Sequence, residues 1–168
     1  MSAGDRVILV GCTKTKRAER SMARDLYDPS DLFRRRRAYA EASGLPWAIL
    51  SARAGVISPD FVLDPYDMTI AQRRRPDMDP RGWAISSIQA AFRLAGADVL
   101  EDPIVIEVHA GIDYVRTLEL ALPAFTRSER ITIEHPVAGM QIGEQKAHYL
   151  PPAPAVELPP LGQLCLAL

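Results

Sequence analysis

The 168-residue sequence contains little cysteine, and its two cysteines form no pattern. Cys12 and Cys165 lie far apart in the chain, and neither belongs to a metal-ligand spacing. A domain of this length buries about 70% of its unfolded surface, so it needs no disulfide or metal to be stable. Scarce cysteines without a pattern are typical of proteins in a reducing compartment, and we therefore expect a cytoplasmic location.

Long apolar stretches and metal-binding patterns are also missing. The apolar run nearest the N-terminus is only Val7–Val10, and Asp5 and Arg6 precede it. Because a membrane-spanning helix needs about 20 apolar residues, we expect neither a membrane span nor a signal peptide. His135 and His148 have no cysteine or carboxylate at ligand spacing. We predict no zinc site, no other metal and no cofactor.

Net charge is small but unevenly distributed. Residues 1–53 contain 11 Lys and Arg against 6 Asp and Glu, whereas residues 54–168 contain 9 against 15. The basic residues include two runs, Arg34–Arg37 and Arg73–Arg75. Such runs are either solvated surfaces or contacts for phosphate groups, and the sequence leaves both interpretations open.

The order of the predicted elements indicates an α/β fold. We predict four strands at residues 7–10, 47–50, 104–108 and 131–133, and four helices at residues 31–43, 80–95, 114–122 and 139–150, with Ser30 and Asp113 as caps. Strands that alternate with helices favour a parallel sheet covered on both faces. The prediction is one three-layer domain over residues 1–150 with a four-stranded, mainly parallel sheet, for which we favour strand order 2-1-3-4. Residues 151–168 are proline-rich and are expected to form an extended tail.

Small and polar residues follow each predicted strand. In open parallel sheets, ligands bind beyond the carboxyl ends of the strands, so we expect a binding cleft there. The candidate binding residues after the first three strands are Cys12, Thr13, Lys14, Lys16, Ser51, Ala52, Arg53, Gly55, Gly111 and Tyr114. His109, at the end of the third strand, is a candidate for proton transfer.

A long proline-containing loop follows the second strand. Residues 51–67 are expected to form an ordered wall or lid of the cleft, because Pro59 and Pro65 restrict the backbone. Asp60, Tyr66 and Asp67 are the candidate functional residues of this loop. The alternative is a plain connection whose aspartates cap turns and face water.

Several candidates also have a purely structural interpretation. Cys12 could be a small core residue rather than a nucleophile. Lys14 and Lys16 could bind phosphate or be ordinary surface lysines, and the glycine spacing of a P-loop is absent. Tyr66 and Tyr114 could be core aromatics or platforms on which a base stacks.

Five blocks of the sequence resemble a bacterial and phage family that is catalogued as a domain of unknown function. The blocks are VILVGCTKTK, LYDPSDLFRRRRAYAEA, WAILSARAGVISPDFVLDPYDMTI, HAGIDYVRTLELALP and VAGMQIGEQKAHYL, and they span about residues 6–150. The third block also looks like the YaaA peroxide-stress proteins, which have been linked to DNA binding. More distant similarity extends to base-handling domains associated with tRNA-guanine transglycosylases and to the uracil-DNA glycosylase type of sheet.

The resemblance implies which residues occupy motif positions. These are Cys12, Thr13, Lys14, Lys16, Ser51, Gly55, Pro59, Tyr66, Asp67, Gly111, Tyr114, Gly139 and Gly143. Ala54 departs from the family pattern, because relatives often have a basic residue or histidine before the motif glycine.

Residues and resemblance together favour an enzyme that acts on a nucleobase, nucleoside or nucleic acid and cleaves or exchanges an N-glycosidic bond. The expected partner is accordingly a nucleobase, nucleotide or nucleic acid. Asp67 or Asp60 is expected to supply a carboxylate, and His109 a proton donor. We expect the base to stack on Tyr66 or Tyr114. We expect phosphate to contact Lys14, Lys16 and Arg53. The alternative is a non-catalytic nucleic-acid or nucleotide-binding protein of a stress-response or phage system, in which the two basic runs matter more than the acids.

Overall fold

A five-stranded mixed β-sheet forms the centre of the computed structural model, which describes residues 6–149. The strand order is β4-β3-β1-β6-β7. The strands are β1 (Arg6–Gly11), β3 (Trp47–Ser51), β4 (Gly55–Ile57), β6 (Ile104–His109) and β7 (Ile131–Glu134). Four of them are parallel, and β4 pairs with β3 in the antiparallel direction.

The fifth strand corrects the prediction of a four-stranded, mainly parallel sheet. The four predicted strands have the favoured order, but the chain turns back after β3 and adds β4 at the edge. Ser51 pairs with Gly55, so the turn contains only three residues. Gly55 has a φ of 72°, a conformation that glycine adopts without strain, and this permits the sharp reversal.

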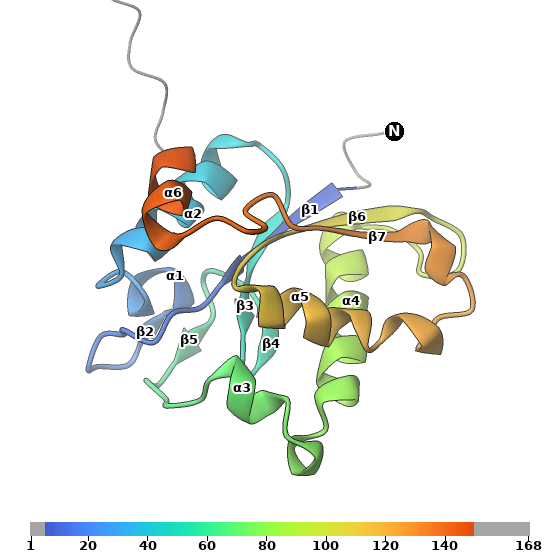
Figure 1. Cartoon of the computed structure of the whole chain (residues 1–168), viewed down its shortest axis with the longest axis horizontal. Coiled ribbons are helices and arrows are strands. Elements are labelled where there is room, and N and C mark those ends of the chain that lie inside the picture. Colours follow the sequence, from blue (N-terminus) through green and yellow to red (C-terminus); the bar gives the residue numbers. More distant parts are fainter. Residues whose placement is uncertain (1–5, 150–168) are drawn as a thin grey trace, which may run out of the picture.

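Helices cover both faces of the sheet (Figure 1). One face carries α1 (Ala23–Leu26) and α2 (Asp31–Ala42), with α6 (Ile142–His148) packed against α2. The other face carries α4 (Pro80–Ala95) and α5 (Ile112–Glu119). The prediction of an α/β domain with helices on both faces is therefore confirmed.

Successive side chains of β1 pack alternately into the two halves of the core, one on each face of the sheet. Val7 and Leu9 pack toward α4 and α5, whereas Ile8 and Val10 pack toward α1 and α2. All four side chains are fully buried, as expected for a central strand with both faces covered. No helix within residues 6–149 is both long and apolar enough to cross a bilayer.

The helix boundaries show which local signals were correct. Ser30 accepts a hydrogen bond from the backbone N–H of Phe33 and caps α2 as predicted. α4 has the predicted bounds. α5 begins two residues earlier than predicted, with Gly111 rather than Asp113 at the N-cap, and α6 is shorter than predicted. The predicted tail, residues 151–168, lies outside the described residues, as does Cys165.

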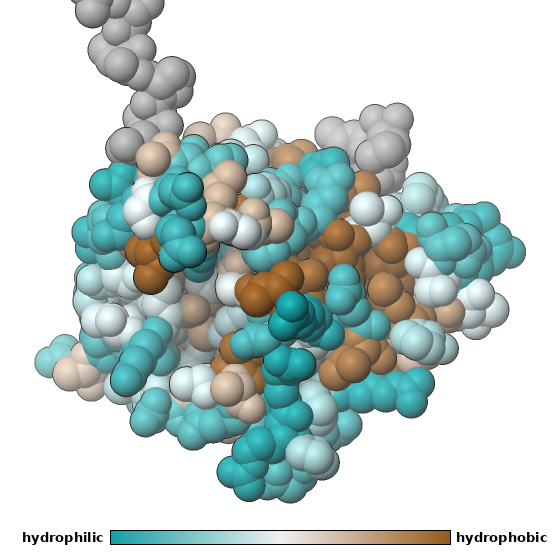
Figure 2. Space-filling view, viewed as in Figure 1, coloured by the Kyte–Doolittle hydropathy of each residue, from teal (hydrophilic) through white to brown (hydrophobic). Residues whose placement is uncertain are grey.

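Short elements connect the main ones. The segment 51–67 is not a single lid, because it contains β4 and β5. The two-residue strand β5 pairs with β2, about 40 residues earlier in the chain. The short elements are β2 (Ser21–Met22), β5 (Val62–Leu63), α3 (Ile70–Arg73) and three 3₁₀ turns, η2 (Pro76–Met78), η3 (Leu122–Ala124) and η4 (Ser128–Arg130). Figure 2 shows hydrophilic residues over α3 and η2 and apolar residues gathered over α5.

Candidate functional site

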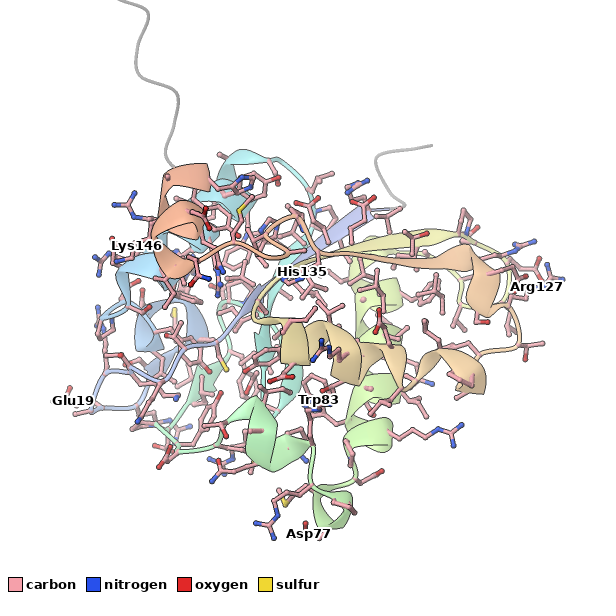
Figure 3. The ribbon with its side chains drawn as sticks, viewed as in Figure 1. Glu19, Asp77, Trp83, Arg127, His135 and Lys146 are labelled. Carbon is pink, nitrogen blue, oxygen red and sulfur yellow. The ribbon has the colours of Figure 1, made fainter. Side chains whose placement is uncertain are left out.

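The carboxyl ends of the parallel strands lie at one edge of the sheet. Gly11 is opposite Leu50 of β3, and Val10 is opposite His109 of β6. Figure 3 shows His135 on the loop after β7, and its Nε2 donates a hydrogen bond to the carbonyl of Ala110 at 2.8 Å. The segments that follow β1, β3, β6 and β7 therefore meet at this edge.

The end of β1 is the point at which the strand order reverses. β3 lies on one side of β1 and β6 on the other, and the connecting helices cover opposite faces of the sheet. Crevices at such positions are where open α/β sheets bind ligands. A Cβ atom at Gly11 would lie 2.5 Å from the Cβ of Ala110, so the end of β1 can approach β6 this closely only because residue 11 is glycine.

A pocket of about 170 Å³, which we call the strand-end pocket, opens at this position. Its lining residues are Cys12, Thr13, Lys14, Lys16, Asp67, Met68, Thr69, Ile70 and Tyr114. Six of them are residues that the sequence singled out, from three separate segments of the chain. The volume is below the roughly 300–1,000 Å³ of typical ligand pockets, so it suits one planar ring or one small charged group.

Tyr114 and Cys12 join the two sides of the strand-end pocket. The Tyr114 hydroxyl and the Cys12 Sγ are hydrogen-bonded at 3.1 Å. Burial raises the pKa of Tyr114, whose residue surface is only 7% exposed. The hydroxyl therefore stays protonated at neutral pH and can donate a hydrogen bond.

A second group of hydroxyls lies beside the pocket at the end of β3. The Tyr66 hydroxyl is hydrogen-bonded to the Ser51 Oγ at 2.6 Å and to the Tyr27 hydroxyl at 2.8 Å. Ser51 Oγ also accepts hydrogen bonds from the backbone N–H groups of Arg53 and Ala54. Burial raises the pKa values of Tyr27 and Tyr66, so both hydroxyls stay protonated. This network fixes the loop containing Asp67 against the strand ends.

Replacing Tyr66 by Phe is expected to lower the free energy of unfolding by about 1–3 kcal/mol, because the buried Tyr27 hydroxyl loses its partner. Urea denaturation measures the change. The double variant Tyr27→Phe/Tyr66→Phe removes both hydroxyls of that bond and is expected to recover part of the loss. If the double variant loses more free energy of unfolding than the two single variants lose together, this account is wrong.

Lys16 and Arg53 carry positive charge at the same edge. The Lys16 Nζ lies 4.6 Å from the centre of the Tyr66 ring, and the Arg53 guanidinium carbon lies 5.6 Å from it. Neither cation, nor Lys14, has a carboxylate within ion-pair distance in the described part of the chain. These three side chains are therefore available to an anionic ligand.

The structure does not bring His109 into the strand-end pocket. Its residue surface is 0% exposed, and it points toward α2 and α6 rather than to the strand-end opening. Its Nε2 donates a hydrogen bond to the Glu107 carboxylate at 2.6 Å, and its Nδ1 is hydrogen-bonded to the Tyr149 hydroxyl at 2.6 Å. Both ring nitrogens are therefore occupied by protein partners.

Asp60, Ala52 and Gly55 also lie outside the strand-end pocket. Asp60 is exposed and forms an ion pair with Arg24. Ala52 is buried in the core between β3 and α4. Gly55 lines a different and larger cavity, and Gly111 is exposed at the start of α5.

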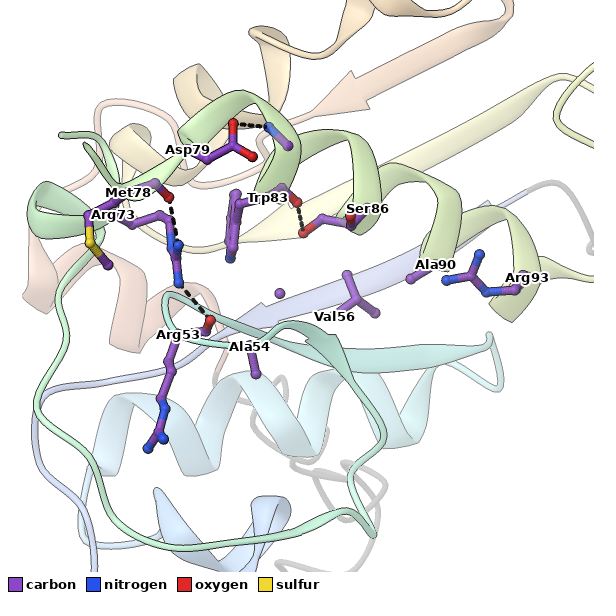
Figure 4. A pocket seen from close by; sticks show the side chains of 13 residues that line it. Arg53, Ala54, Val56, Arg73, Met78, Asp79, Trp83, Ser86, Ala90 and Arg93 are labelled. Carbon is purple, nitrogen blue, oxygen red and sulfur yellow. Dashed lines mark hydrogen bonds between the residues drawn. The ribbon is translucent and has the colours of Figure 1, made fainter. Parts of the chain in front are cut away.

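The larger cavity, of about 440 Å³, lies between β4 and α4 (Figure 4). Trp83 forms part of its wall and donates a hydrogen bond from Nε1 to the Ser51 carbonyl at 3.1 Å. Arg73 is held there by the carbonyl oxygens of Met78 and Arg53, and the Arg53 side chain points away from the cavity. The cavity contains none of the carboxylates that the sequence proposed for catalysis.

Both basic runs are occupied by partners within the protein. Arg34, Arg35 and Arg37 pair with acidic residues of α1, α2 and their connection. Arg74 pairs with Asp113, and Arg75 pairs with Asp77. Arg37 joins α2 to α1, and Arg74 joins the end of α3 to α5, so these two arginines have a structural role. The pairs of Arg34, Arg35 and Arg75 are local.

Sequence reasoning missed part of the lining of the strand-end pocket and also missed the burial of Arg36. Met68, Thr69 and Ile70 complete the pocket wall, and no local pattern distinguishes them from other loop residues. Arg36 was read as part of a basic run, but it is buried. Its position three residues after Phe33 and four before Ala40, on the apolar side of α2, was the signal that could have revealed this.

Comparison with known proteins identifies a family. Within residues 6–149, no group of three or more His, Cys, Asp or Glu side chains is placed to hold a metal ion. Searches of curated proteins and of solved structures each found no match, so the resemblances to YaaA and to glycosylase-type domains stay predictions. The model of a family of unknown function, DUF6884, matches residues 7–150. This match covers most of the chain, which therefore belongs to the DUF6884 family.

Proposed function

We propose that the protein acts on a nucleobase, nucleoside or nucleic acid and cleaves or exchanges an N-glycosidic bond in the strand-end pocket. The observation that carries this proposal is the position of Asp67 in one pocket with Lys14, Lys16 and the protonated Tyr114 hydroxyl. A carboxylate, cations and a neutral donor are the groups that such a reaction requires.

The chemistry assigns a role to each group. Loss of a base develops positive charge on the sugar, which the Asp67 carboxylate would stabilise while it positions a water molecule or the incoming base. The departing base becomes negative and needs a proton or a hydrogen bond. Lys14, Lys16 and Tyr114 line the pocket and can donate, and they replace His109 in the proposal because both of its nitrogens are engaged.

The geometry also limits how a base could stack. Lys16 Nζ lies 4.6 Å from the centre of the Tyr66 ring, so a base can stack on that face of Tyr66 only if Lys16 moves. Tyr114 is buried and offers its hydroxyl rather than its ring face. A base in this pocket would therefore be held mainly by polar contacts at its edge.

The test is release of free base from a panel of nucleosides, nucleotides, single-stranded DNA and RNA, measured by mass spectrometry. Asp67→Asn is expected to reduce the rate about 100-fold or more while binding is retained. Asp64→Asn is the matched control, because Asp64 is an exposed carboxylate three residues earlier that does not line the strand-end pocket. Equal rates for wild type and Asp67→Asn would contradict the assignment.

A non-catalytic nucleic-acid-binding protein is the second candidate. It is supported by Lys14, Lys16 and Arg53, which form no ion pair among residues 6–149. In that case Asp67→Asn changes nothing, and no substrate of the panel releases its base. Lys14→Gln/Lys16→Gln would reduce the slope of log affinity against log salt by about 1–2, since each lost phosphate contact contributes about 0.7–0.9. Arg34→Gln, which removes an arginine paired with Asp31, would leave the slope unchanged.

A further inference from the structure

A cavity of about 270 Å³, which we call the loop cavity, lies between the turn after β3 and the segment that contains β5. Its lining residues are Arg53, Ala54, Phe61, Val62, Leu63 and Asp64. The charge of Asp64 is offset by an ion pair with Arg20, whereas Arg53 forms no ion pair among residues 6–149. Figure 4 shows that the Arg53 side chain points away from the larger cavity. The loop cavity therefore offers a positive charge to a ligand.

Phe61 is a large apolar side chain that the fold leaves exposed beside the loop cavity. Its residue surface is 52% exposed, and that of the adjacent Val62 is 44% exposed. The backbone of Phe61 is nevertheless fixed, because its N–H donates to the Ser58 carbonyl at 3.0 Å and its carbonyl accepts a hydrogen bond from the Ala23 N–H at 2.8 Å. An aromatic ring that is exposed on a fixed backbone is a surface on which a nucleic-acid base can stack.

The Tyr66 ring connects the loop cavity to the strand-end pocket. The Arg53 guanidinium carbon, from the loop cavity, lies 5.6 Å from the ring centre, and the Lys16 Nζ, from the strand-end pocket, lies 4.6 Å from it. Hydrogen bonds with Ser51 and Tyr27 hold the Tyr66 hydroxyl in place. The two pockets are therefore neighbours, and each contributes one cation to the region between them. A phosphodiester that joins two nucleotides carries the negative charge that this region suits.

We propose that the loop cavity is a second nucleotide subsite, and that the substrate of the strand-end pocket is a single-stranded nucleic acid rather than a free nucleoside. One base stacks on Phe61, and Arg53 and Lys16 contact the phosphodiester that joins it to the nucleotide beside Asp67. The subsite deepens the function proposed above and rests on it for the reacting nucleotide. Proteins bind single strands through such combinations of cations and aromatic rings, whereas the bases of a duplex are already stacked on one another.

Fluorescence anisotropy of a labelled single-stranded hexanucleotide of mixed sequence, made as DNA and as RNA, tests the subsite. The full chain is expected to bind the better of the two strands about tenfold or more tightly than nucleoside 5′-monophosphates. Phe61→Ala is expected to lower the affinity for that strand about 5- to 100-fold and to leave monophosphate binding unchanged. Phe61→Trp keeps a ring and is expected to bind like the wild type. Leu100→Ala is the control, because Leu100 is 59% exposed and lines neither pocket.

The salt dependence of binding tests the role of Arg53. Arg53→Gln is expected to reduce the slope of log affinity against log salt by about 0.7 for the single strand, which is the contribution of one phosphate contact. Arg127→Gln is the matched control, because Arg127 is exposed in the connection before β7 and lines neither pocket (Figure 3). Equal slopes for Arg53→Gln and the wild type would remove Arg53 from the subsite.

Three results would overturn the subsite. The first is a single strand that binds no better than the monophosphates or than a duplex of the same sequence. The second is a Phe61→Ala variant that binds the strand as tightly as the wild type. The third is a Phe61→Ala variant that loses self-association but keeps its affinity for the strand, because the exposed apolar surface would then join two copies of the chain.

Base release separates the subsite from the proposed function. If the strand binds as expected but releases no base, the subsite stands and the N-glycosidic function fails. If free nucleosides release their base and single strands do not, with equal rates for the wild type and Phe61→Ala, the function stands and the subsite fails.

Discussion

Replacing Glu107 by Gln is expected to lower the free energy of unfolding at pH 7 by about 3 kcal/mol. Glu107 lies on β6 with a side chain that is only 8% exposed. Its Oε1 accepts hydrogen bonds from His109 at 2.6 Å and Tyr39 at 3.0 Å, and its Oε2 accepts one from Arg6 at 2.9 Å. Side chains from β1, α2 and β6 therefore all donate hydrogen bonds to this one carboxylate.

The pKa of Glu107 gives the sign of the pH dependence. The hydrogen bond from His109 is the main reason why this pKa falls from 4.5 to about 2, although burial acts against it. A lowered pKa in the folded state contributes stability that is fully present above pH 4.5 and is lost as the pH falls toward 2. The wild type is expected to lose about 3 kcal/mol over this range from Glu107 alone.

Urea denaturation at a series of pH values measures both effects. Glu107→Gln is expected to show a shallower loss of stability between pH 4.5 and 2 than the wild type. Glu119→Gln is the matched control, because Glu119 is exposed on α5 and belongs to no ion pair within the described residues. If the free energy of unfolding of Glu107→Gln falls between pH 4.5 and 2 as steeply as that of the wild type, the loss does not come from protonation of Glu107.

Replacing Gly11 by Ala is expected to destabilise the protein by about 1–3 kcal/mol. The added Cβ would lie 2.5 Å from the Cβ and 3.1 Å from the Cα of Ala110, so the ends of β1 and β6 would have to separate. Because Cys12 follows Gly11 and lines the strand-end pocket, the same change is expected to weaken ligand binding there.

Two variants identify the cause of that loss. Gly11→Ala/Ala110→Gly removes the Cβ of residue 110 and is expected to recover only part of the stability, because the backbone of residue 110 still lies 3.1 Å from the added methyl group. Gly143→Ala, within α6, meets no atom within 4 Å and is expected to be neutral or slightly stabilising. If Gly11→Ala proves as stable as Gly143→Ala, the close approach of the two strand ends is not a constraint.

The sequence predicted the fold best where an apolar pattern is compatible with only a few arrangements of strands and helices. Apolar runs such as Val7–Val10 and Ile104–Val108, separated by helices, leave few topologies, and the order of the four main strands follows from them. β4 could not be found this way, because it has three residues and depends on the turn at Gly55. β2 and β5 have two residues each and exist only because distant segments meet.

The candidate site was predictable at the level of the strand ends rather than of each side chain. The rule for parallel sheets correctly placed Cys12, Lys14 and Tyr114 at one edge, but it does not say toward which face a strand's last side chain points. Alternation along β6 puts His109 on the same face as Glu107, toward α2 and α6. Glu107, the partner of Nε2, is two residues earlier on the same strand, whereas Tyr149, the partner of Nδ1, is brought near only when the chain folds.

The claim that the strand-end pocket binds the ligand is tested most directly by amide NMR spectra of the ¹⁵N-labelled protein titrated with nucleoside 5′-monophosphates. We expect the largest shift changes in residues 12–16, 67–70 and 111–114, and only small changes around the larger cavity. The same titration of Lys14→Gln/Lys16→Gln is expected to show weaker binding at the same residues. Shift changes confined to residues 53–56 and 78–93 would place the ligand in the cavity between β4 and α4 and would contradict the claim.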